Sequence, residues 1–256
     1  MNEPKDRPYV ICHMQSSIDG RISGKFFFTP AAEAVYEKDN EIRKNYQADA
    51  VMNGAVTCGE IYSDGFLQPG DLPDEPANAA CSREDFIAEP CFGRYIVCVD
   101  PEGTLRWNKN TVIHRGNPKA HVIEILTEDV DRRYLAYLKA RGISYIFAGE
   151  AELDLQLALS KLQASFGIQR ILLTGGGQMN WTFLRAGCID ELNLVILPMI
   201  DGNTVSAGLF DRPLSDGNSS KQDAAAFAFS QFRLTEINQL PEDSLCLKYV
   251  PLKASL

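Results

Sequence analysis

The feature with the clearest chemical potential is a glycine-rich loop of five residues, Gly175, Gly176, Gly177, Gln178 and Met179. Before it lies a short apolar, partly β-branched run, which is typical of a strand buried on both faces and consists of Ile168, Ile171, Leu172 and Leu173. Apolar residues then recur at helical spacing until Gly187, which has the position of a C-cap glycine. A strand, a glycine loop and a helix in this order direct backbone N–H groups and a helix dipole at one point, where they favour an anion. The pattern therefore predicts a loop that cradles a pyrophosphate.

The same loop has a second interpretation, because glycine clusters also make tight turns between a strand and a helix without any ligand. The spacing is neither G-x-G-x-x-G nor G-x-x-x-x-G-K-[ST], so it supports neither an ordinary Rossmann site nor a P-loop. However, another buried-strand pattern follows over residues 189–202 after a single helix. The loop then lies at the carboxyl end of the first strand of a strand-helix-strand unit, where open α/β sheets bind their ligands.

The elements that must position this loop alternate between short apolar strands and helices. The other strands are expected over residues 9–14, 48–53, 95–99, 121–127 and 144–148, and the helices over 29–46, 59–62, 130–141 and 153–166. This alternation indicates an α/β fold with a largely parallel sheet and helices on both faces. The first helix has Thr29 as its N-cap and Pro30 at its first position. The helix over residues 153–166 is expected to bury one apolar stripe, which consists of Leu153, Leu157, Leu162 and Phe166.

Near the C-terminus, residues 227–240 and 244–252 alternate apolar and polar side chains around a Pro-Glu-Asp turn. This pattern predicts an antiparallel hairpin added at a sheet edge. Residues 63–93 contain four prolines and little periodicity, which indicates a long surface excursion that is either functional or mobile. We expect a single domain over residues 1–256, with residues 1–8 as a loose tail.

Composition narrows the class of protein. The 256 residues are 45% hydrophobic and carry a net charge of −9. No cluster of Lys and Arg stands out, which argues against a nucleic-acid partner, and no apolar run approaches the ~20 residues of a membrane span. The seven cysteines form no C-x-x-C, and the three histidines show no ligand spacing with them, so we expect no metal. Free thiols in a reducing cytoplasm are the expectation, with Cys12, Cys98, Cys188 and Cys246 as small core residues.

Several segments occur in one order along the chain: residues 17–21 (Ser-Ile-Asp-Gly-Arg), 50–57, 97–103, 175–181 and 189–192. Together they resemble the reductase domain of riboflavin biosynthesis, the C-terminal domain of a bifunctional deaminase-reductase, within the dihydrofolate-reductase-like superfamily. The similarity spans roughly residues 8 to 250. It implies a mixed, mostly parallel sheet flanked by helices, an NADPH cofactor, commonly a homodimer, and reduction of a pterin- or pyrimidine-type substrate.

The resemblance also implies roles for single residues. Ser16 and its loop correspond to a contact near the nicotinamide, and Thr57 to a hydroxyl that contacts the cofactor. Residues 175–179 correspond to the pyrophosphate loop, and Asp100 with Pro101 to the adenosine end. Judged from the residues alone, Thr57 is also a possible helix cap and Asp100 a possible Asx turn.

Two departures from the family pattern concern the substrate. The riboflavin enzymes commonly carry a glutamate directly before the glycine loop, where this chain has Thr174. They also have an aspartate soon after the Thr57 position, where counting leads to Ile61 or Tyr62, with Glu60 and Asp64 nearby. A lost carboxylate removes charge-assisted hydrogen bonds worth about 1.5–3 kcal/mol each. The deaminase signature is absent as well, because there is no H-x-E and Pro90-Cys91 lacks the second cysteine of P-C-x-x-C.

These observations leave three hypotheses. The first is a stand-alone NADPH-dependent reductase acting on a phosphoribosylamino-pyrimidine. The second is a reductase of the same fold with another substrate, such as a dihydropterin or another carbonyl or enone compound, and the third is a non-catalytic nucleotide-binding protein. For the two enzyme hypotheses, the catalytic candidates are Asp19, Glu60 and Asp64, and the substrate-binding candidates are Asp19 and Thr174. The loop that contains Asp19 follows the first strand, although Asp19-Gly20 is also typical of an ordinary turn.

Overall fold

The computed structural model describes residues 6–72, 83–89, 93–113, 118–212 and 230–252. It divides into two compact units, each made of two chain segments. Unit 1 contains Met1–Tyr9 and Ala48–Leu172, and unit 2 contains Val10–Gln47 and Leu173–Leu256. The two units are described separately below. The expected single domain over residues 1–256 stays a prediction.

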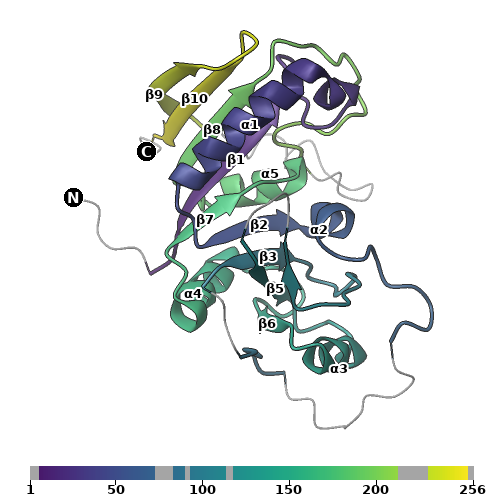
Figure 1. The fold of residues 1–256 in the computed structure, drawn as a ribbon. Helices are drawn as coiled ribbons and strands as arrows, with labels where there is room; N and C mark the ends of the chain where they lie inside the picture. Colours follow the sequence, from purple (N-terminus) through teal and green to yellow (C-terminus); the bar gives the residue numbers. More distant parts are fainter. Residues whose placement is uncertain (1–5, 73–82, 90–92, 114–117, 213–229, 253–256) are drawn as a thin grey trace, which may run out of the picture. The chain divides into compact units, whose positions relative to one another are not determined.

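Unit 1 contains a mostly parallel sheet and three helices that connect its strands (Figure 1). Its strands follow the order β4-β5-β3-β2-β7, and β6 also pairs with β5. The pairs β2–β3, β3–β5 and β5–β6 are parallel, whereas β4–β5 is antiparallel. The strands are β2 (Ala50–Gly54), β3 (Tyr95–Val99), β4 (Thr111–Val112), β5 (Ala120–Leu126), β6 (Ser144–Phe147) and β7 (Arg170–Leu173). The helices are α2 (Ala55–Ile61), α3 (Arg132–Ala140) and α4 (Leu155–Phe166).

The core of unit 1 forms because β3 and β5 are buried along their whole length. Helix α3 contributes Tyr134, Leu135 and Leu138, which are fully buried in the same cluster as Val122 of β5 and Trp107. Burying such side chains contributes roughly 1.5–3 kcal/mol each, so this layer holds the strand ends in fixed positions.

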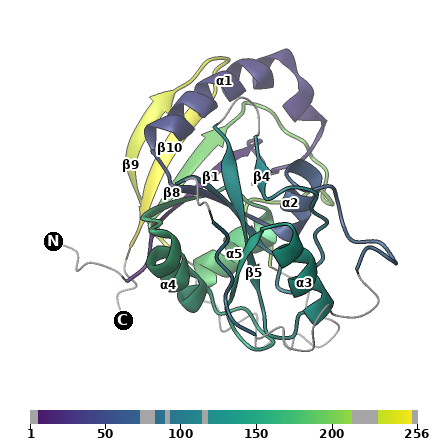
Figure 2. The ribbon, with the colours of Figure 1, turned by 60° about the horizontal axis from the view of Figure 1, so that its bottom comes forward.

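Unit 2 is a smaller mixed sheet in the order β1-β8-β10-β9. Its strands are β1 (Tyr9–Ser16), β8 (Glu191–Ile196), β9 (Phe232–Gln239) and β10 (Leu245–Pro251). The pair β1–β8 is parallel, and β10 runs antiparallel to both β8 and β9. The hairpin β9–β10 lies at the edge of this sheet, next to β8 (Figure 2), as the alternating pattern predicted.

The helices of unit 2 are η1 (Lys25–Phe28), α1 (Pro30–Asn45) and α5 (Gly177–Arg185). Helix α1 begins as expected, since the Thr29 Oγ1 accepts the Ala32 N–H at 3.3 Å and Pro30 is its first residue. It lies along β1 and β8 in both views (Figures 1 and 2). Helix α5 ends at Arg185, and Gly187 follows with a φ of +63°, which confirms the predicted C-terminal glycine.

The sequence-based boundaries needed corrections. Helix α2 begins at Ala55 rather than near Gly59, so Thr57 lies inside it. The expected stripe of α4 was wrong at Leu157, which is 39% exposed, because Leu155, Ala158, Leu159 and Leu162 are the buried residues. Strand β8 ends at Ile196, two residues before Pro198, and the first hairpin strand begins at Phe232. Strand β4 and helix η1 were not predicted. Residues 73–82 and 90–92 of the expected excursion, and 227–229 of the hairpin, lie outside the described residues.

Candidate functional site

The glycine loop between β7 and α5 needs glycine at position 175 because of the backbone conformation there and the close packing of Met14. Gly175 has a φ of +111°, which side chains of L-residues rarely allow. A Cβ atom there would lie 3.1 Å from the Cε of Met14. Gly176 is the N-cap of α5 and has no side chain with which to cap the helix. No side chain therefore caps the start of α5, and a helix N-terminus of this kind favours an anion.

Gly177 has a different reason to be glycine. A Cβ atom at this position would lie 2.3 Å from the carbonyl oxygen of Gly208 and 2.7 Å from the Asp211 Oδ2. The absence of a side chain at Gly177 thus permits close packing within the protein, whether or not a ligand binds. Of the two following candidates, Gln178 is exposed and Met179 is buried in the core.

The candidates after β1 lie in a tight loop. Ser16 is the last residue of β1, is buried, and its backbone oxygen accepts the Leu197 N–H at 2.8 Å. The Asp19 carboxylate accepts three hydrogen bonds, from the Ser17 Oγ at 2.6 Å and from the backbone N–H groups of Asp201 at 3.1 Å and Gly202 at 2.9 Å. The Ser17 hydroxyl and these N–H groups lower the pKa of Asp19 to about 2. Asp19 is therefore ionised at neutral pH.

In unit 1, two candidates lie on α2, which follows the carboxyl end of β2. Thr57 is the third residue of this helix and is half-buried, and Glu60 is exposed. Asp64 lies just beyond the helix, and its Oδ2 accepts the Asn108 N–H at 3.0 Å. Because β2 and β3 are parallel neighbours, with Gly54 paired to Val99, Thr57 follows the same sheet edge as Asp100.

Asp100 is only 1% exposed, and its carboxylate is used within its own turn. It accepts the N–H groups of Thr104 at 2.6 Å and Leu105 at 2.9 Å, and the Thr104 hydroxyl at 2.9 Å. Burial raises the pKa of Asp100, although these donors oppose the shift. These bonds reach residues four and five positions further on, so the Asp100 side chain closes a wider turn than the expected Asx turn, in which the bond spans two residues. The Pro101 carbonyl accepts the Thr127 N–H at 3.1 Å and hydroxyl at 2.8 Å, so the candidate adenosine end rests on an ordered turn.

The structure thus brings the candidates together in two groups. Unit 2 holds the glycine loop, Thr174, Ser16 and Asp19, and unit 1 holds Thr57, Glu60, Asp64, Asp100 and Pro101. Thr174 is half-buried between β7 and Gly175. The functional roles of all these residues stay predictions. Within the described ranges, no group of three or more His, Cys, Asp or Glu side chains is arranged to hold a metal ion.

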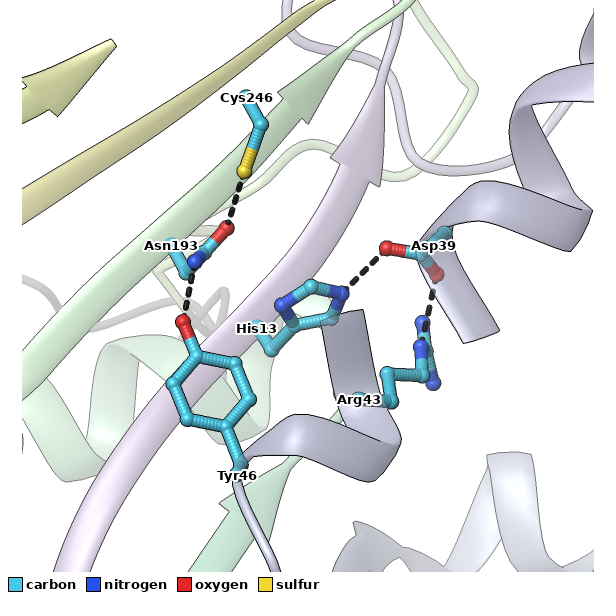
Figure 3. Close-up of polar contacts among 6 residues, drawn as sticks. All are labelled: His13, Asp39, Arg43, Tyr46, Asn193 and Cys246. Atoms are coloured by element: carbon cyan, nitrogen blue, oxygen red, sulfur yellow. Dashed lines mark hydrogen bonds and ion pairs between the residues drawn. The ribbon is translucent and has the colours of Figure 1, made fainter. Parts of the chain in front are cut away.

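Sequence reasoning missed a polar cluster beneath α1 (Figure 3). His13 of β1 and Asp39 of α1 are both fully buried, with the His13 Nε2 2.5 Å from the Asp39 Oδ1. Arg43 donates from its Nε to the Asp39 Oδ2 at 2.7 Å. Beside them the Asn193 amide donates to the Tyr46 hydroxyl, and the Cys246 thiol donates to the Asn193 Oδ1 at 3.1 Å. The available signal was the spacing of Asp39, which continues the buried series of Ala32 and Val35 on α1.

Burial decides the charge states in this cluster. It lowers the pKa of His13, although the Asp39 carboxylate opposes the shift. Burial by itself would raise the pKa of Asp39, but the charge of Arg43 and the hydrogen bonds from Arg43 and His13 hold it well below its usual range. We therefore assign an ionised Asp39 with Arg43 as its counter-charge, and a neutral His13 that donates its Nε2–H to Asp39.

Comparison with known proteins assigns the class. The family model of the RibD C-terminal domain matches residues 8–245, so the chain belongs to this family. In the part of the chain that the structure describes, no helix has the length and apolar character needed to span a bilayer.

Two curated relatives carry the same name, 2,5-diamino-6-ribosylamino-4(3H)-pyrimidinone 5′-phosphate reductase. The one from Methanothermobacter thermautotrophicus is 29% identical over 209 residues, which cover 80% of this chain and 84% of the relative. The one from Aquifex aeolicus is 26% identical over 203 residues, covering 77% and 80% respectively. Both names describe a reductase of a pyrimidinone phosphate, and the resemblance to the riboflavin-biosynthesis reductase domain is confirmed.

Solved structures confirm the fold. A pyrimidine reductase-like protein from Corynebacterium diphtheriae aligns with a TM-score of 0.64 at 17% identity, over 96% of this chain and 92% of that one. The riboflavin biosynthesis reductase Rib7 of Saccharomyces cerevisiae aligns with a TM-score of 0.57 at 13% identity, over 98% and 93%. The mixed, mostly parallel sheet flanked by helices, with a C-terminal antiparallel hairpin, is therefore correct.

Proposed function

We propose that this chain is an NADPH-dependent reductase of the riboflavin pathway that acts on a phosphoribosylamino-pyrimidine. The observation that carries the proposal is the family match over residues 8–245, together with two relatives that are named as reductases of such a pyrimidinone phosphate. The position of the glycine loop supports a nicotinamide cofactor, because the loop leads directly into the N-terminus of α5, and the backbone N–H groups of a helix N-terminus favour a pyrophosphate.

The bound cofactor would supply the hydride, so the chain's own residues have to bind, orient and deliver a proton. Gly175 and Gly176 would hold the pyrophosphate, the Thr57 hydroxyl would contact the cofactor, and Ser16 would lie near the nicotinamide. At the adenosine end, the Asp100 carboxylate is committed to Thr104 and Leu105. We therefore propose that backbone groups of Asp100 and Pro101, rather than this carboxylate, meet the cofactor.

The proton requires a group that can receive it from solvent and pass it on. The Asp19 carboxylate, with a pKa of about 2, is already bonded to three donors and is a poor candidate for this relay. Glu60 and Asp64 are exposed carboxylates and remain the candidates among the residues singled out. We propose that one of them, directly or through water, delivers the proton.

A second candidate function is a reductase of the same fold with another substrate. It is favoured by Thr174, which stands where the riboflavin enzymes commonly have a glutamate and which offers a hydroxyl and a methyl group instead of a carboxylate. The non-catalytic nucleotide-binding hypothesis has no such observation in its favour.

The test is a substrate panel in which oxidation of NADPH or NADH is followed by absorbance. Rapid oxidation of NADPH with the pyrimidinone phosphate supports the proposal, and a preference for NADH would correct the cofactor. Turnover of only a pterin or enone would favour the second candidate. No oxidation with any compound, despite NADPH binding, would leave the non-catalytic hypothesis.

We also propose that the enzyme is a homodimer in the cytoplasm. The family resemblance supports the dimer, and buried free thiols at Cys12, Cys58, Cys98, Cys188 and Cys246 support a reducing compartment. Sedimentation at several protein concentrations tests the dimer, and a monomer at all of them would refute it.

A further inference from the structure

The loop after β1 is fastened to the segment that follows β8. We call residues 199–211 the strap. Its Met199 carbonyl accepts the Ile18 N–H at 2.8 Å, and its Ala207 carbonyl accepts the Ile22 N–H at 2.9 Å. In the other direction, the Leu209 N–H donates to the Gly20 carbonyl at 3.0 Å. These bonds pair the strap with residues 18–22 like a short, irregular ladder.

Side chains reinforce this pairing. The Arg21 guanidinium donates from its Nη1 to the Ser206 carbonyl at 2.9 Å. The Ser206 hydroxyl donates to the Asp201 Oδ2 at 2.7 Å, which closes the strap on itself. At one end, the Asp19 carboxylate takes the N–H groups of Asp201 and Gly202, as described above. Two of the three donors to this exposed carboxylate lie in the strap, so Asp19 joins the loop after β1 to the strap.

The other end of the strap is attached at the start of α5. The Asp211 N–H donates to the Gly177 carbonyl at 3.0 Å, and the Asp211 Oδ2 accepts the Gly208 N–H at 2.7 Å. The Asn180 side chain donates to the Leu209 carbonyl at 2.8 Å. Gly177 and Gly208 both leave room for the Asp211 carboxylate, since a Cβ atom on either would lie within 2.7 Å of one of its oxygens.

We propose that the strap positions the loop after β1 and the N-terminus of α5 for cofactor binding, and that Asp19 is the positioning residue that fastens it. This inference rests on the proposed function, since it assigns those two elements to the nicotinamide and pyrophosphate. It changes the role of Asp19 from a participant in the chemistry to a fixed acceptor of backbone hydrogen bonds.

Asp19→Asn tests the role with almost no change in size. The amide keeps one acceptor oxygen but turns an NH2 group toward N–H donors, so at least one charge-assisted hydrogen bond is lost. NADPH affinity should fall about 10- to 100-fold. Exchange of the Asp201 and Gly202 amide hydrogens should become faster, and the pH profile of kcat should keep its shape.

Ser206→Ala separates positioning from chemistry. Removing the Ser206 hydroxyl should loosen the strap, and Ser206 is not one of the proposed catalytic or binding residues. Losing its hydrogen bond to the Asp201 carboxylate should weaken NADPH binding about 2- to 10-fold, less than in Asp19→Asn, because this bond lies within the strap and does not join it to the loop after β1. If both residues act through the strap, the double variant should lose less affinity than the product of the two single losses. Asp243→Asn, an exposed carboxylate in the β9–β10 turn, is the matched control and should behave as the wild type.

Two outcomes would overturn the proposal. The first is a loss confined to kcat in Asp19→Asn, with normal NADPH affinity and a normal Ser206→Ala variant, which would make Asp19 a catalytic residue. The second is unchanged exchange at Asp201 and Gly202, which would show that Asp19 does not fasten the strap. The exchange measurement needs no turnover, so a wild type that binds no NADPH would refute the proposed function and leave the fastening of the strap testable.

Discussion

Thr174 is the residue at which substrate choice is most open to experiment. It is half-buried at the end of β7, directly before the glycine loop. A glutamate there would accept two hydrogen bonds from a sugar diol or a pyrimidine donor, whereas threonine offers a single neutral hydroxyl.

We predict that Thr174→Glu raises kcat/KM for the riboflavin-pathway pyrimidine about 10- to 100-fold, which corresponds to one charged hydrogen bond. Steady-state kinetics of both proteins with that substrate provide the measurement. Efficient turnover by the wild type, together with a slower glutamate variant, would show that the threonine does not alter substrate choice.

Glu60 and Asp64 are the residues on which we place the proton. Changing a general acid to its amide typically lowers the rate by a factor of about 10²–10⁴. We expect Glu60→Gln or Asp64→Asn to lower kcat by such a factor while NADPH binding persists. In Asp64→Asn the remaining oxygen still accepts the Asn108 N–H, so its fold should be preserved. Full turnover in both variants would mean that water or a backbone group delivers the proton.

At the scale of the element, helix α1 is held to the sheet of unit 2 by a buried polar cluster rather than by apolar contacts alone. His13 and Asp39 are fully buried at its centre (Figure 3). Polar groups from α1 and its C-cap, from β8 and from β10 surround these two residues: Arg43, Tyr46, Glu191, Asn193 and Cys246. Such a cluster links the attachment of α1 to pH.

The sign of the effect follows from the two pKa shifts. Folding lowers the pKa of His13. Below the unfolded value of about 6.5, the unfolded chain therefore binds a proton that the folded chain does not, and the free energy of unfolding decreases as the pH is lowered. The pKa of Asp39 is also lowered, so its contribution is present above its unfolded value of about 3.9 and is lost as the pH falls further. Acid should therefore destabilise α1 in two stages.

We predict that the free energy of unfolding decreases between pH 6.5 and 5 by up to about 1.4 kcal/mol per pH unit for each such histidine. His13→Gln, which can still donate to Asp39, should reduce this slope in denaturant titrations. It should not abolish the slope, because burial lowers the pKa of His121 as well. An unchanged slope in the variant would show that His13 is not kept neutral by burial.

At the scale of the whole molecule, NADPH binding should raise the melting temperature, because a ligand that binds only the native state stabilises it by mass action. Gly176→Asp should abolish this shift, since its carboxylate would lie where the phosphates are expected. Gly177→Ala makes a useful contrast. Its added Cβ would meet the Gly208 carbonyl, so the variant should melt at a lower temperature even without cofactor. A full NADPH shift in Gly176→Asp would remove the glycine loop from the cofactor site.

The local pattern of the sequence determined a large part of this molecule. The spacing of apolar residues along the sequence located nearly all the strands and helices, because this spacing differs between a strand buried on both faces and an amphipathic helix. Thr29 and Pro30 marked the start of α1, and Gly187 followed the end of α5, since capping depends on neighbouring residues only. The ordered motifs, taken together, also indicated the family.

The tertiary structure alone decided which hydrogen bonds and packing contacts the candidate residues make. Asp19 and Asp100 have the residue type of catalytic or binding carboxylates, yet their oxygens are taken by backbone N–H groups of Asp201 and Gly202, and of Thr104 and Leu105. Gly177 belongs to a phosphate-binding pattern, yet it is required by the packing of Gly208 and Asp211. The pairing of His13 with Asp39, 26 residues apart, depends on the packing of α1 on β1. Hydrogen-bond partners that are distant in the chain leave no periodic signal in the sequence, so only the folded arrangement reveals them.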